Sequence, residues 1–141
     1  MTALTESDQS RFHHMGYVVA SISAIVEHFA VSVQAQWDGN ITYDSLQGVR
    51  VTFLRYSRPN IPMIELVEPA SENSPVSSFL KKGGGLHHLC YEVASLQTAM
   101  EYARSTGGLV VCQPVPAVAF NGRLIAWVYT RERLLVEYLE A

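Results

Sequence analysis

The stretch GGGLHHLCYEV, residues 83–93, decides how the chain folds, because it places two adjacent histidines inside an apolar segment with the character of a strand. Side chains alternate between the two faces of a strand. His88 therefore shares a face with Cys90 and Glu92, and its neighbour His87 faces the opposite side. Only one histidine of the two can serve a site on a given face.

The composition is that of one ordinary globular domain. The 141 residues are 48% hydrophobic and 16% charged, and the formal net charge is -3 without any run of basic residues. No segment approaches the roughly 18 consecutive apolar residues that a membrane span needs. Cys90 and Cys112 give neither a disulfide framework nor a zinc spacing, which fits a reducing compartment. We expect a cytoplasmic protein that binds neither nucleic acid nor membranes.

Hydrophobic periodicity divides the chain into two halves with the same order of elements. The predicted strands cover residues 12–20, 41–45, 48–57, 62–69, 85–93, 109–120, 123–130 and 134–140. One helix is expected to begin after Ser21 and another after Ser95, because serine is a preferred N-cap residue. Each half therefore has the order βαβββ.

These elements define the predicted domain organisation. Residues 1–10 are polar and are expected to form a disordered tail. The remainder, 11–141, forms a single domain with module one over 11–69, a connector over 70–84 and module two over 85–141. The connector holds a short helix over 76–81.

The two modules also repeat a pair of chemistry-bearing residues. His14 lies in the first strand of module one and Glu65 in its last strand, and His88 and Glu137 take the same places in module two. The histidine precedes its glutamate by nearly the same number of residues in both modules. A single histidine or glutamate in a strand is usually hydrogen-bonded or faces water, but the repetition favours a shared site.

Two imidazoles and two carboxylates suit one divalent metal ion, such as cobalt, nickel, zinc, manganese or iron. We therefore predict that His14, Glu65, His88 and Glu137 gather around one ion. The ion would also balance the carboxylate charges within the apolar segments IEL and VEY, where an unpaired charge would be costly.

At these residues the sequence resembles the vicinal oxygen chelate superfamily, which includes glyoxalases, methylmalonyl-CoA epimerases, extradiol dioxygenases and metal-free antibiotic-binding proteins. The segments QGVRVTFL, IELVEP, SPVSSFLKKGGGLHHLCYEV and LLVEYLE are most similar to the methylmalonyl-CoA epimerases. The resemblance implies an α+β fold in which two tandem βαβββ modules form a half-open eight-stranded cup, often as a homodimer. It also implies a metal set at His14, Glu65, His88 and Glu137.

The chemistry expected of such a site is proton abstraction next to a carbonyl through a metal-stabilised enolate. We expect an epimerase or isomerase whose small-molecule substrate is an acyl-CoA or another thioester. Glu137 is the predicted base as well as a ligand, and Glu65 is the second catalytic candidate. Epimerisation also requires a second acid, which the sequence does not identify.

Three alternative functions use the same fold. A glyoxalase-type lyase acting on a hemithioacetal needs only one base. A metal-free small-molecule binding or resistance protein would have no reason to keep the four ligands. A ring-opening dioxygenase uses two histidines and one glutamate, so the additional Glu65 argues against it.

For several residues near the predicted ligands, the sequence leaves more than one role open. His13 and His87 face away from the ligands and are expected to pack beneath helices or to be partly exposed. Glu92 either lines the cavity or reaches water. Trp127 either lines the pocket or packs below it, and Arg123 is a candidate phosphate contact, although basic residues are usually solvated.

Overall fold

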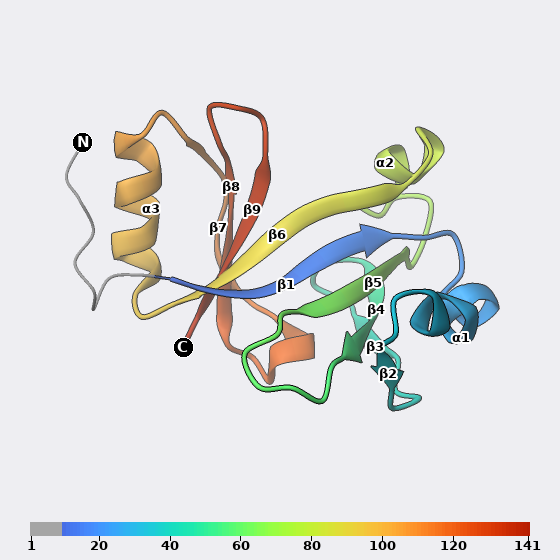
Figure 1. The fold of residues 1–141 in the computed structure, drawn as a ribbon. Helices are drawn as coiled ribbons and strands as arrows, with labels where there is room; N and C mark the ends of the chain where they lie inside the picture. The colour runs from blue at the N-terminus through green and yellow to red at the C-terminus, as the bar shows by residue number, and fades with distance from the viewer. Residues whose placement is uncertain (1–9) are drawn as a thin grey trace. The chain divides into compact units, whose positions relative to one another are not determined.

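The computed structural model describes residues 10–141, and positions 1–9 of the predicted disordered tail lie outside the described residues. The elements are β1 (Arg11–Val18), α1 (Ile22–Ser32), β2 (Gln36–Trp37), β3 (Thr42–Asp44), β4 (Val49–Arg55), β5 (Met63–Pro69), α2 (Ser77–Lys81), β6 (Gly85–Val93), α3 (Leu96–Ser105), β7 (Leu109–Pro116), η2 (Val118–Phe120), β8 (Leu124–Tyr129) and β9 (Leu135–Glu140) (Figure 1). The predicted α+β class and the repeated βαβββ order are confirmed, with β2 as an additional short strand.

The strands form an open sheet with a repeated pairing pattern. Hydrogen-bonded neighbours follow the order β2-β4-β5-β1-β6-β9-β8-β7, and β3 also pairs with β4. In each module the first strand runs parallel to the last strand: β1 pairs with β5, and β6 pairs with β9. This pairing brings the first-strand histidine of each module next to the strand that carries its glutamate.

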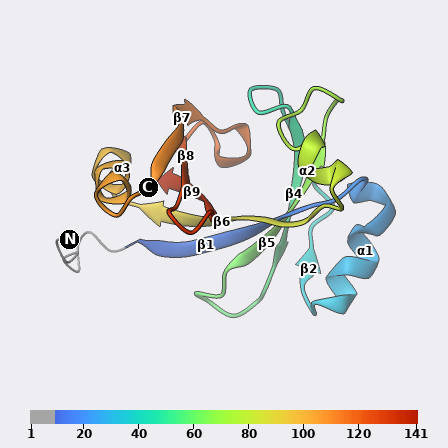
Figure 2. The same ribbon diagram turned by 90° about the horizontal axis from the view of Figure 1, so that it is seen from above.

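The chain divides into two compact units. The N-terminal unit is His14–His87, and the C-terminal unit combines residues 10–13 with His88–Ala141. β1 and β6 lie side by side (Figure 2), and each of them contributes residues to both units. The module boundaries and the cup shape proposed from the sequence stay predictions. Within residues 10–141, no helix has the length and hydropathy to cross a membrane.

In the N-terminal unit, α1 covers one face of β4 and β5. Ser21 caps the helix as predicted, because its hydroxyl oxygen accepts a hydrogen bond from the Ala24 amide at 3.3 Å. The buried residues that join the helix to these strands are Ile22, Val26, Ala30, Leu54, Ile64 and Leu66. Since strand side chains alternate, Glu65 lies on the opposite face of β5 from Ile64 and Leu66.

The C-terminal unit repeats this arrangement with α3. Ser95 accepts a hydrogen bond from the Thr98 amide at 3.3 Å, which confirms the predicted cap. The core beneath the helix consists of Val93, Leu96, Met100 and Ala126. Tyr138 packs against this core, so the preceding residue Glu137 faces the other side of β9. Both modules therefore keep the face that carries the glutamate clear of the helix.

The predicted strand over 109–120 is wrong in its last four residues. β7 ends at Pro116, and a 3-10 turn occupies Val118–Phe120. Register shifts interrupt the pairing of β7 with β8 on both sides of Cys112. The physical reason is that Pro114 and Pro116 have no amide hydrogen to donate to a neighbouring strand. The turn is closed by a hydrogen bond from the Ala117 amide to the Arg123 carbonyl at 3.0 Å.

Candidate functional site

The N-terminal unit contains one of the two predicted histidine–glutamate pairs. His14 Nε2 on β1 lies 3.4 Å from Glu65 Oε1 on β5, and both side chains are buried. The register explains this proximity, because Glu65 is paired with Gly16, which is two residues beyond His14 on the same strand face. Parallel pairing thus turns a long separation in sequence into a contact.

The C-terminal unit repeats the pair with nearly the same geometry. His88 Nε2 on β6 lies 3.5 Å from Glu137 Oε1 on β9, with side-chain exposures of 3% and 4%. Here Glu137 is paired with Cys90, again two residues beyond the histidine. Both predicted pairs therefore form inside their own units. The assignment of all four residues to one metal ion stays a prediction.

The separations within the pairs fit ligands that share an ion. A strong hydrogen bond between a nitrogen and an oxygen is about 2.7–3.2 Å long, and 3.4 and 3.5 Å exceed this range. Two ligand atoms that each lie about 2.1 Å from one ion, at tetrahedral or octahedral angles, are roughly 3.0–3.5 Å apart. The buried nitrogen and oxygen donors thus have both the chemistry and the spacing of metal ligands.

An aromatic ring accompanies each pair. Phe53 on β4 is paired with Glu65, and its ring lies edge-on to His14 with 5.5 Å between ring centroids. Trp127 on β8 is paired with Glu137, and its ring lies edge-on to His88 at 4.8 Å. The modules therefore repeat three residues, not two. Both rings are only half-buried, and they form apolar surface directly beside the buried donors.

Glu92 is a paired anion. Its carboxylate lies 2.6 Å from Arg123 and 3.3 Å from Arg11. The hydrogen bond from Arg123, helped by the charge of Arg11, lowers the pKa of Glu92 below its ordinary value. Arg123 also donates from Nε to the Glu140 carbonyl at 2.9 Å. This ion pair secures the end of the β7–β8 connection and makes Glu92 a poor proton acceptor.

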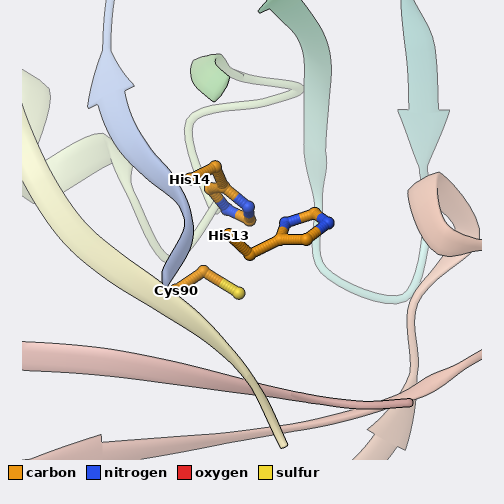
Figure 3. Close-up of side chains that lie close together, drawn as sticks. All are labelled: His13, His14 and Cys90. Atoms are coloured by element: carbon orange, nitrogen blue, oxygen red, sulfur yellow. The ribbon is translucent and has the colours of Figure 1, made fainter. Parts of the chain in front are cut away.

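The two histidines that precede the predicted ligands have different surroundings. His87 packs edge-on against Phe79 of α2 at 4.9 Å, as expected for a residue beneath a helix. His13 is half-buried and packs edge-on against Phe120 at 5.5 Å. A ring nitrogen of His13 lies within 4.8 Å of the buried Cys90 thiol (Figure 3).

Sequence reasoning missed two glutamates that fix the helices. Glu68 Oε1 accepts a hydrogen bond from the Ile22 amide at the start of α1, at 2.7 Å. Glu140 Oε2 accepts one from the Leu96 amide at the start of α3, at 3.0 Å. Each of them follows the glutamate of the candidate site by three residues. The repeated Glu-x-x-Glu spacing, in ELVE and EYLE, is the signal that could have revealed them.

Comparison with known proteins identifies the family. Residues 13–127 match the Glyoxalase/Bleomycin resistance protein/Dioxygenase superfamily. The chain belongs to this superfamily. The resemblance drawn from the sequence motifs is therefore confirmed, and the superfamily fold accounts for the two βαβββ modules.

Relatives within the superfamily include epimerases. The chain is 28% identical over 124 residues to the ethylmalonyl-CoA/methylmalonyl-CoA epimerase of Cereibacter sphaeroides. The aligned residues cover 86% of this chain and 90% of the relative. The crystal structure of the hypothetical protein BH1468 from Bacillus halodurans C-125 has a TM-score of 0.81 and 28% identity, covering 94% of this chain and 95% of that one. A Streptomyces coelicolor methylmalonyl-CoA epimerase variant in complex with 2-nitronate-propionyl-CoA has a TM-score of 0.77 and 24% identity, with coverages of 94% and 97%.

Proposed function

We propose that this protein is a metal-dependent epimerase of 2-alkylmalonyl-CoA thioesters. The observation that carries the proposal is the buried histidine–glutamate pair, which is built in the same way in both units, with separations of 3.4 and 3.5 Å. The similarity to an ethylmalonyl-CoA/methylmalonyl-CoA epimerase supports the choice of substrate class. The predicted homodimer and cytoplasmic location are part of the same proposal.

In this proposal, His14, Glu65, His88 and Glu137 hold one divalent ion. The donor set consists of two imidazole nitrogens and two carboxylate oxygens, which suits cobalt, nickel, zinc, manganese or iron. When bound, such an ion supplies Lewis-acid stabilisation to the negative charge that develops on a carbonyl oxygen. The burial of all four side chains protects the donors from water.

Glu137 is our candidate base. Its carboxylate would take the proton from the α-carbon of the thioester, and the electron pair of the broken C–H bond would move into the carbonyl to give an enolate. Return of a proton to the opposite face of that carbon would invert its configuration. Glu65, which has the equivalent place in module one, is our candidate for the second acid.

The half-buried rings support this chemistry through their position. Phe53 and Trp127 each pack against a ligand histidine and replace water beside it with apolar surface. A site with little water strengthens the electrostatic interactions of a developing enolate and protects it from stray proton exchange. The two rings can exclude water in this way without any change in the geometry of either histidine–glutamate pair.

Solvent isotope exchange tests the proposal. Purified protein loaded with cobalt is incubated with methylmalonyl-CoA or ethylmalonyl-CoA in heavy water, and the thioester is analysed by mass spectrometry. We expect incorporation of one deuterium and conversion between the two epimers, both abolished by a chelator. As a control variant, Tyr129→Phe should exchange deuterium like the wild-type protein, because Tyr129 is an exposed residue on the same strand as Trp127.

Two outcomes would contradict the proposal. Metal-loaded protein that leaves both thioesters unlabelled is not an epimerase of this class, and turnover of a hemithioacetal by the same preparation would favour the glyoxalase-type lyase. Equal exchange with and without chelator would remove the metal from the mechanism.

A further inference from the structure

Trp127 packs beside the His88–Glu137 pair within the C-terminal unit. His88 and Glu137 are each 3% exposed, whereas the indole packed edge-on against His88 is only half-buried. A half-buried aromatic ring therefore lies directly next to these two donors. An apolar substituent of a molecule held at the pair would meet this ring.

The space beyond the indole is filled. On the same face of the sheet, Trp127 packs against a core of fully buried residues, namely Cys90, Ala117, Ile125 and Leu139. Phe120, from the turn between β7 and β8, packs against the same core. This turn is held shut by hydrogen bonds from the Ala117 amide to the Arg123 carbonyl and from the Gly122 amide to the Ala117 carbonyl. The side of the indole that packs against this core is thus occupied by protein.

The equivalent ring in the N-terminal unit offers a different surface. The guanidinium of Arg55 lies over the ring of Phe53, with its Cζ atom 5.9 Å from the ring centroid. This cation–π contact places a charge on the face that an alkyl group would otherwise use. An alkyl group is expected to avoid a hydrated cation, so the ring of Phe53 is a poor surface for it.

We propose that Trp127 determines substrate specificity: its indole is the wall on which the alkyl branch of a 2-alkylmalonyl thioester rests, and its size restricts that branch to one or two carbons. The inference rests on the proposed epimerase function. The α-carbon of such a substrate carries a carboxylate, a thioester carbonyl, an alkyl group and the acidic hydrogen. The two oxygen-bearing groups would face the ion that the ligand residues hold, and the alkyl group would face the indole.

Replacing the indole by a smaller ring tests the size limit. Trp127→Phe keeps an aromatic edge for His88 but removes ring volume, so kcat/KM for propylmalonyl-CoA relative to methylmalonyl-CoA should rise about tenfold, the effect of about one methylene group in an apolar pocket. Phe53→Leu removes the corresponding ring in the other unit and should leave this ratio within about twofold. An unchanged or lower ratio in Trp127→Phe, or an equal rise in Phe53→Leu, would overturn the inference.

Fluorescence tests the contact without relying on turnover. The chain has two tryptophans, and Trp37→Phe leaves Trp127 as the only indole. In this variant, cobalt with ethylmalonyl-CoA should shift the emission to shorter wavelength more than cobalt with malonyl-CoA, because only the former carries an alkyl branch. Identical shifts with the two thioesters would overturn the inference.

The two readouts separate this inference from the proposed function. Wild-type protein that exchanges no α-hydrogen in any 2-alkylmalonyl-CoA is not an epimerase, whatever the fluorescence shows. Wild-type protein that exchanges the hydrogen, together with a Trp127 emission that does not respond to the branch, is an epimerase whose specificity is set elsewhere.

Discussion

Replacing Glu68 by alanine should destabilise the protein by about 2–3 kcal/mol. The lost interactions are a hydrogen bond of 2.7 Å from the Ile22 amide to the Glu68 carboxylate and an ion pair with Arg50 at 3.3 Å. Hydrogen bonds to charged groups contribute about 1.5–3 kcal/mol. Arg50 is 45% exposed, so the ion pair adds between about 0 and 1 kcal/mol.

Two further variants make the magnitude specific. Glu68→Gln keeps an oxygen acceptor for the amide but removes the charge at the helix N-terminus, so we expect a loss of about 1 kcal/mol. Glu140→Ala removes the equivalent bond of 3.0 Å at the start of α3, where we expect about 2 kcal/mol. Glu72→Ala, a change of an exposed glutamate, should alter the free energy of unfolding by no more than about 0.5 kcal/mol.

Urea denaturation followed by far-UV circular dichroism measures these free energies, with a chelator present so that metal binding does not contribute. An unchanged slope with denaturant would show that the variants differ in stability and not in the compactness of the unfolded chain. A loss below about 0.5 kcal/mol for Glu68→Ala, or equal losses for the alanine and glutamine variants, would refute the assignment of Glu68 as a charged helix cap.

Three further predictions concern the site and its surroundings. Desalted wild-type protein should retain about one equivalent of cobalt by elemental mass spectrometry, as expected for one four-ligand site, and His88→Ala should not; equal retention would contradict the ligand assignment. Glu137→Gln should slow deuterium exchange into methylmalonyl-CoA at least about a hundredfold, as expected for a lost general base, and an unchanged rate would exclude Glu137 as the base. The hydrogen bond from Arg123 lowers the pKa of Glu92 in the folded protein. The ionised carboxylate therefore stabilises the fold at pH values above the ordinary pKa of a glutamate, and this contribution disappears as the pH falls through the folded-state pKa. Glu92→Gln should therefore lower the Tm more at pH 7 than at pH 3, and calorimetry showing equal decreases would contradict the pairing with Arg123.

Local signals in the sequence were sufficient for most of the fold. Ser21 and Ser95 were recognised as helix caps because an N-cap acts on amides only a few residues away. His88 and Glu137 were recognised because side chains alternate along a strand and the same pattern occurs twice. Periodicity of two and duplication therefore located both histidine–glutamate pairs without coordinates.

The features that were missed depend on contacts distant in sequence. Glu68 reaches the start of α1 from 46 residues away, and no local pattern encodes that contact. The edge-on packing of Phe53 and Trp127 against the histidines requires the strand register, which hydrophobic patterns do not give. The break after Pro116 reflects competition between strand propensity and the missing amide hydrogens of two prolines, and the residue at which a strand ends is the least certain part of a sequence prediction.

The path of β1 has a consequence for how the polypeptide could be cut. Its first residues belong to the C-terminal unit, where Phe12 stacks at 5.3 Å from Tyr91 and Arg11 pairs with Glu92. A recombinant fragment beginning at Gly85 would lose these partners and leave one edge of β6 uncovered. Such a fragment should be insoluble when expressed by itself and should become soluble when it is co-expressed with a peptide carrying the first strand.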